Sequence, residues 1–123
     1  MAIEVLVVDE EADVLDITET FLDRQDGLSV TSEMDPERAA ERIIDGECDA
    51  VVSDLTMPDL NGLELCQRVR EAGREVPFFL FTGRDETEID DSPGKECVTG
   101  FVRKGTGTEQ YETLAENIRN AVA

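Results

Sequence analysis

The chain has 123 residues, of which 40% are hydrophobic and 33% charged, a composition typical of one folded domain rather than of a disordered chain. Thirty acidic against eleven basic residues leave a net charge of −19, which disfavours nucleic acid and anionic membrane surfaces as partners because both are negatively charged. No apolar stretch approaches the ~20 residues of a membrane-spanning helix, which excludes helical membrane proteins as a class.

Short apolar runs alternate along the chain with longer amphipathic ones, a pattern typical of strands followed by helices. Because the short runs are apolar throughout, they predict a parallel sheet covered by helices on both faces. The expected elements are a strand over Ile3–Val8, a helix over 14–22, a strand over Leu28–Thr31, a helix from Asp35 to Gly46, a strand over Ala50–Ser53, a helix from Asn61 to Ala72, strands over Val76–Phe81 and Thr99–Arg103, and a helix over 111–122.

The segment 83–100 departs from this alternation. Ile89 is the only large apolar residue over 84–96, so a helix there would have little surface to bury. Pro93–Gly94 would end such a helix early. We therefore expect at most a short helix near Asp85–Asp90, followed by an irregular loop.

Polar side chains stand where the predicted strands end. Asp9 and Glu10 follow the first strand, Asp54 the third and Lys104 the fifth, while Thr82 ends the fourth. A single acid at such a point is more often a helix cap or a turn residue. The carboxyl ends of parallel strands share one edge of the sheet, however, so these five groups should converge there.

The chemistry of this set points to phosphoryl transfer. Three carboxylates within ~4 Å of one another would repel by roughly 4 kcal/mol per pair at an effective dielectric of 20, so a cation is needed, and magnesium suits such oxygen ligands. Lys104 and Thr82 suit phosphate oxygens as a point charge and a hydroxyl donor. Asp54, central in the set, can attack phosphorus and form an acyl phosphate.

The chain as a whole resembles the receiver domains of two-component response regulators. This resemblance implies one flavodoxin-like domain over residues 1–123, with a doubly wound five-stranded parallel sheet of order 2-1-3-4-5 and a weak or irregular fourth helix. The matching stretches, in order, are "VLVVDEEADVL", "DAVVSDLTMPDLNGLELC", "VPFFLFTGR" and "GFVRKG".

The resemblance also implies the ligands of the ion. Magnesium is held at the acidic pair Asp9 and Glu10, at Asp54 and at the backbone carbonyl of Thr56. Glu10 stands where aspartate is more common, and its extra methylene shifts the ion or admits a water molecule.

In the family, the aspartate at the position of Asp54 takes a phosphoryl group from a phosphohistidine of a sensor histidine kinase or phosphotransfer protein. Such a domain belongs to phosphorelay signalling and is not a turnover enzyme on an external substrate. Thr82 and Lys104 then act on the phosphoryl group, and Phe101 matches the aromatic switch position, although an aromatic residue on a buried strand can equally be part of the core. Gly105 replaces the usual proline after Lys104, so a cis peptide is not expected there.

Two other functions fit parts of the pattern. An aspartate-nucleophile phosphatase would share these groups, but it requires a second acid two residues after the nucleophile, where this chain has Thr56. A receiver-like module that binds partners without phosphorylation would be marked by loss of Asp54 or Lys104, and both are present.

The cellular setting is inferred from composition. The three cysteines, Cys48, Cys66 and Cys97, are odd in number and widely spaced, which favours reduced thiols over a disulfide framework. No basic segment of a signal peptide precedes the first strand, so we expect a cytoplasmic protein. The net charge, and a likeness of "KGTGTEQYETLAENIRNAV" to receivers attached to sensor proteins of extreme halophiles, indicate a high-salt cytoplasm and a link to further domains.

Overall fold

Five parallel strands form one sheet in the computed structural model, which describes residues 2–57, 60–83, 94–105 and 107–122. The strand order is 2-1-3-4-5, and every neighbouring pair is parallel, which confirms the predicted flavodoxin-like architecture. The strands are β1 (Ile3–Val8), β2 (Leu28–Glu33), β3 (Ala50–Ser53), β4 (Phe78–Thr82) and β5 (Gly100–Arg103).

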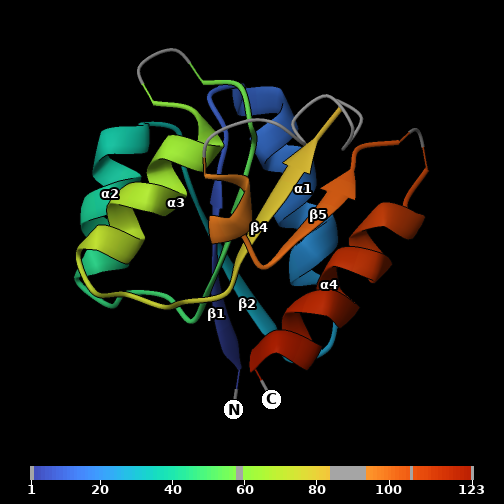
Figure 1. Ribbon diagram of the computed structural model, residues 1–123. Helices are drawn as coiled ribbons and strands as arrows, with labels where there is room; N and C mark the ends of the chain where they lie inside the picture. Colours follow the sequence, from blue (N-terminus) through green and yellow to red (C-terminus); the bar gives the residue numbers. More distant parts are fainter. Residues whose placement is uncertain (1, 58–59, 84–93, 106, 123) are drawn as a thin grey trace.

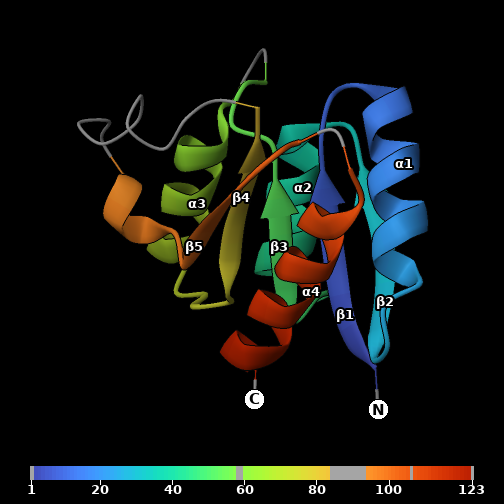
Figure 2. The same ribbon diagram turned by 90° about the vertical axis from the view of Figure 1, so that its right-hand side faces the viewer.

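Helices cover both faces of this sheet (Figures 1 and 2). Two of them, α2 (Pro36–Ile44) and α3 (Gly62–Glu71), lie on one face, while α1 (Ala12–Asp23) and α4 (Glu109–Val122) lie on the other. A short 3-10 helix, η2 (Lys95–Cys97), precedes β5. None of the helices in the described part of the chain is long and apolar enough to cross a membrane.

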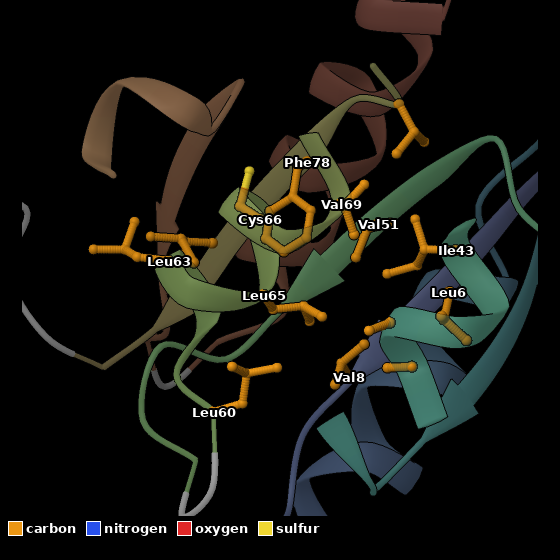
Figure 3. Packing of buried hydrophobic residues seen from close by; sticks show 14 of the residues in the cluster. Leu6, Val8, Ile43, Val51, Leu60, Leu63, Leu65, Cys66, Val69 and Phe78 are labelled. Atoms are coloured by element: carbon orange, nitrogen blue, oxygen red, sulfur yellow. The ribbon is translucent and has the colours of Figure 1, made fainter. Parts of the chain in front are cut away.

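The core consists of two hydrophobic clusters, one on each side of the sheet. The cluster between the sheet and the α2–α3 layer is shown in Figure 3, where Phe78 of β4 lies among Val51 of β3 and Val69 of α3. The opposite cluster includes Leu22 of α1 and Leu114 of α4. All four residues of β3 are buried, as expected for a strand in the middle of such a sheet.

Local capping explains where two helices begin. The side chain of Asp35 accepts a hydrogen bond from the amide of Glu37 (3.0 Å), and α2 starts at the following proline. Asn61 and Glu64 form the predicted capping box, with bonds of 2.8 and 2.9 Å between each side chain and the other residue's amide. These reciprocal bonds fix the first turn of α3 close to the end of β3.

Some boundaries differ from those predicted. Strand β4 begins at Phe78 rather than at Val76, since the intervening Pro77 has no N–H to donate to a neighbouring strand. Strand β2 extends to Glu33 and stays paired with β1 up to Val8. The predicted short helix near Asp85–Asp90 lies outside the described residues.

Gly62 provides a test of the packing between α3 and the sheet. A Cβ atom at this position would lie 2.5 Å from the backbone oxygen of Asp54 and 2.8 Å from Leu80 Cδ2. We expect Gly62→Ala to lower the free energy of unfolding by roughly 1–3 kcal/mol, the usual cost of overpacking. Gly83→Ala is the matched control, because a Cβ atom there meets nothing within 4 Å. Equal unfolding free energies of the two variants in chemical denaturation would contradict the close approach.

Candidate functional site

The carboxyl ends of the strands meet at one edge of the sheet, at the top of Figure 1. Asp54 follows β3, and its amide donates a hydrogen bond to the carbonyl of Val8, the last residue of β1 (2.9 Å). Lys104 follows β5, and its amide donates to the carbonyl of Thr82, the last residue of β4 (2.8 Å). The strand pairing thus continues to the residues that carry the polar side chains.

The centre of this edge is an ion-pair network around Lys104. Its Nζ lies 3.0 Å from Oδ2 of Asp9 and 3.5 Å from Oδ1 of Asp54. The two carboxylates are largely withdrawn from water, with side-chain exposures of 5% for Asp9 and 13% for Asp54. The Nζ also lies 5.5 Å from the ring centroid of Phe81 on β4. One ammonium group therefore neutralises part of the charge of two acids from different strands.

A backbone amide donates to one carboxylate oxygen of each acid. Oδ1 of Asp9 accepts from the amide of Glu11 (3.0 Å), and Oδ1 of Asp54 accepts from the amide of Leu55 (2.9 Å) as well as facing Lys104. Within the described ranges, no residue donates a hydrogen bond to Oδ2 of Asp54. The hydrogen bond from the Leu55 amide and the ion pair with Lys104 thus both involve Oδ1 of Asp54.

A family model of the response regulator receiver domain matches residues 5–116. The chain belongs to this family. It is a receiver domain, and such domains serve as phosphoacceptors in two-component signalling. The resemblance inferred from the motifs is thus confirmed over nearly the full sequence.

Solved structures share the fold of this receiver domain at low sequence identity. They include the response regulator domain of CheB from Thermotoga maritima (24% identity, TM-score 0.85, covering 99% of this chain and 97% of that one). A response regulator receiver domain protein from Clostridium thermocellum is similar (22%, TM-score 0.82, 99% and 94%). NtrX from Brucella abortus matches 99% of this chain over only 28% of its own length (24%, TM-score 0.82), so the same fold also occurs as part of a longer protein.

The structure brings together three of the predicted site residues, Asp9, Asp54 and Lys104. Thr82 is buried at the end of β4, on the strand next to the one that Lys104 follows. Glu10 is partly buried. Among the residues described, no three carboxylate or thiol side chains are grouped closely enough to hold a metal ion, so Glu10 does not complete a triad with the other two acids. The metal ligands stay a prediction.

Several contacts of the site carry no signal in the sequence. The amides of Glu11 and Leu55 bind the two acids through the backbone, which every residue possesses. Phe81 lies beneath the Lys104 ammonium, although an apolar strand alone would mark it only as core. Phe101, for which a switch and a core role were both open, is partly buried and packs against the α2–α3 cluster.

Burial raises the pKa of the Asp54 carboxyl above 3.8, its ordinary value. The Lys104 ammonium opposes this shift, the charge of Asp9 adds to it, and the hydrogen bond from the Leu55 amide again opposes it. The folded chain therefore binds this proton more tightly than the unfolded chain does. The free energy of unfolding should fall as the pH rises from 3.8 through the folded pKa, because the ionised carboxylate is the less favourable form in the fold.

Asp54→Asn, which stays neutral at every pH, should therefore stabilise the domain at pH 7. The gain in melting temperature should shrink as the pH is lowered toward 3.8, the ordinary value of the carboxyl. Asp16→Asn is the matched control, since it removes the same charge from an exposed position on α1. A gain that is no larger for Asp54→Asn than for Asp16→Asn would show that burial does not destabilise the Asp54 carboxylate.

Proposed function

We propose that Asp54 accepts a phosphoryl group from the phosphohistidine of a sensor histidine kinase or phosphotransfer protein, with magnesium as the cofactor, and that phosphorylation switches partner binding. The observation that carries this proposal is the Lys104 ammonium, which pairs with both Asp9 and Asp54 at the carboxyl edge of the sheet. A carboxylate oxygen held at a sheet edge beside a cation is suited to attack on phosphorus.

Asp54 reacts through a carboxylate oxygen. As the P–O bond to Asp54 forms, the P–N bond of the phosphohistidine breaks, and the imidazole nitrogen keeps the electron pair and takes up a proton. Lys104 supplies a positive charge to an oxygen of the transferred group, while the hydroxyl of Thr82 is suited to donate to another. Since positioning and charge neutralisation carry most of a phosphoryl transfer, a domain without further catalytic groups can promote the reaction.

Oxygen donors of this kind suit a divalent ion, although no three of the described carboxylates are grouped closely enough to hold one. Asp9, Glu10 and Asp54 bring three negative charges to an edge where Lys104 supplies one positive charge, and the backbone carbonyl of Thr56 is a further hard oxygen ligand. Magnesium bound there supplies charge neutralisation for the phosphoryl oxygens. Backbone amides and Lys104 hold the carboxylates of Asp9 and Asp54 in place.

The surface beside Lys104 supports docking of the phosphodonor. A shallow cavity of about 180 Å³ lies between α1, α4 and the ends of β4 and β5. Ile17 lines it together with Lys104 and is 49% exposed, so an apolar side chain of the donor can contact the surface beside Lys104. This arrangement favours a protein donor over direct binding of nucleic acid or membrane, which the net charge of −19 repels. We further propose that the domain works in a high-salt cytoplasm and is linked to further domains. It does not turn over an external substrate.

Phosphorylation of Asp54 can be tested with acetyl phosphate and magnesium. The intact mass of the wild type should increase by one phosphoryl group, and Asp54→Asn should abolish this adduct because an amide cannot attack as a carboxylate does. Asp16→Asn, an exposed acid on α1, should keep it. An adduct that persists in Asp54→Asn would overturn the assignment.

The role of Glu10 can be tested by magnesium titration calorimetry. We expect Glu10→Gln to weaken binding by on the order of tenfold, or about 1.4 kcal/mol, because a ligand charge is lost. Glu11→Gln is the matched control, since the neighbouring Glu11 side chain makes no cap hydrogen bond and is exposed. Equal affinities of the two variants would place Glu10 outside the inner shell.

A further inference from the structure

Two of the three cysteines lie on elements that pack against each other, although they lie far apart in the chain. Cys66 stands in the middle of α3, and Cys97 ends η2, the short helix before β5. Cys66 is buried beside Phe78 in the cluster of Figure 3, whereas Cys97 is only partly buried and packs against that cluster from outside.

The backbone around this pair is held in place on both sides. Arg70 of α3 donates to the carbonyl of Cys97 (3.1 Å) and, through its other terminal nitrogen, to the carbonyl of Val76 (2.7 Å). At the start of η2, Gly94 has a φ of 91°, and a Cβ atom there would lie 2.7 Å from the side chain of Gln67. Only glycine allows this close approach of the η2 backbone to α3. Cys66 and Cys97 therefore lie on elements that are already docked against each other.

We propose that Cys66 and Cys97 are a reversible oxidation site, at which thiol–disulfide exchange with a low-molecular-weight disulfide joins α3 to η2. The wide spacing of the cysteines favours reduced thiols in an ordinary cytoplasm. We therefore expect the disulfide to form when conditions become oxidising. The phosphoacceptor chemistry does not use either residue.

The partial exposure of Cys97 sets the order of the reaction. The Cys97 thiolate attacks the low-molecular-weight disulfide, forming a mixed disulfide and releasing one thiolate, which takes up the proton that Cys97 lost. The Cys66 thiolate then attacks the sulfur of Cys97, and the second small thiolate leaves and takes the proton from Cys66. Two cysteine thiols are oxidised, and the disulfide reagent is reduced to two thiols.

Cys66 is unsuited to the first step. Burial raises the pKa of its thiol well above the ordinary range, the nearby Cys97 thiol adds to this shift, and Arg70 opposes it. A small disulfide cannot reach it directly, since its exposure is 0%. Once Cys97 carries the mixed disulfide, the bond to be attacked lies next to Cys66, so proximity offsets its low thiolate fraction.

The cross-link would restrain the approach to β5. It fixes η2 against α3, and β5 begins three residues after Cys97, with Phe101 packed against the same cluster. The oxidised domain should therefore melt at a higher temperature, because a closed loop limits the unfolded chain. Cys48, the third cysteine, is an internal control for oxidation of the other two. It is a buried free thiol before β3, near the charged residues Arg74 and Asp49, and burial raises its pKa to about 11.

Oxidised glutathione tests the proposal directly. The reduced protein is incubated with it, quenched with acid, denatured, alkylated and mapped by peptide mass. We expect the wild type to lose two hydrogens, to yield a peptide joining Cys66 to Cys97, to alkylate at Cys48 and to revert with dithiothreitol. A stable glutathione adduct on Cys97, or alkylation of Cys66 after the incubation, would overturn the proposal.

Three variants separate the disulfide from other effects. Cys48→Ser should form the same cross-link, whereas Cys97→Ser should form none and should leave Cys66 open to alkylation after denaturation. Asp54→Asn should also form it, so the outcome is independent of the proposed phosphorylation. A mass loss of two hydrogens in Cys97→Ser would assign the disulfide to a different pair.

Discussion

The site depends on one lysine side chain that spans the edge of the sheet. Lys104 follows β5, but the acids that it pairs with follow β1 and β3. Since β4 separates β5 from β3, Lys104 stands two strand spacings, about 10 Å, from the strand that Asp54 follows and three spacings from the strand that Asp9 follows. The Lys104 ammonium also lies over the ring of Phe81 on the intervening strand β4, 5.5 Å from the ring centroid, and this contact helps to hold it beside the carboxylates.

The same interaction makes two withdrawn acids tolerable in a chain that already carries a net charge of −19. Two carboxylates about 4 Å apart would repel by ~4 kcal/mol at an effective dielectric of 20, and burial adds a desolvation cost to each. Lys104 and two backbone amides offset part of this cost. The raised pKa of Asp54 shows that the offset is incomplete, because burial still disfavours its charged form. An edge that keeps an excess of negative charge is suited to bind a further cation.

The rigid packing beneath the edge keeps these groups in position. Strand β3 is buried throughout, and α3 begins so close to its end that a side chain at Gly62 would collide with the backbone of Asp54. The capping box at Asn61 and Glu64 fixes the start of α3 independently. Cys66 lies four residues after Gly62 on the same helix, so α3 carries both the residue packed against Asp54 and one cysteine of the proposed disulfide.

The sequence by itself determined the fold class, because uninterrupted apolar runs alternating with amphipathic segments have few stable arrangements other than a covered parallel sheet. It also identified Asp9, Asp54, Thr82 and Lys104 as strand-end residues, since the carboxyl ends of parallel strands share one edge. Only the tertiary structure decided which of these groups meet. Lys104 bridges Asp9 and Asp54 while Glu10 does not join them in a metal-sized group among the described residues, and this depends on side-chain reach across strands rather than on position in the chain. The proximity of Cys66 and Cys97 was hidden for the same reason: their spacing in the chain argued against a disulfide framework, and the docking of η2 on α3 places the two cysteines on neighbouring elements.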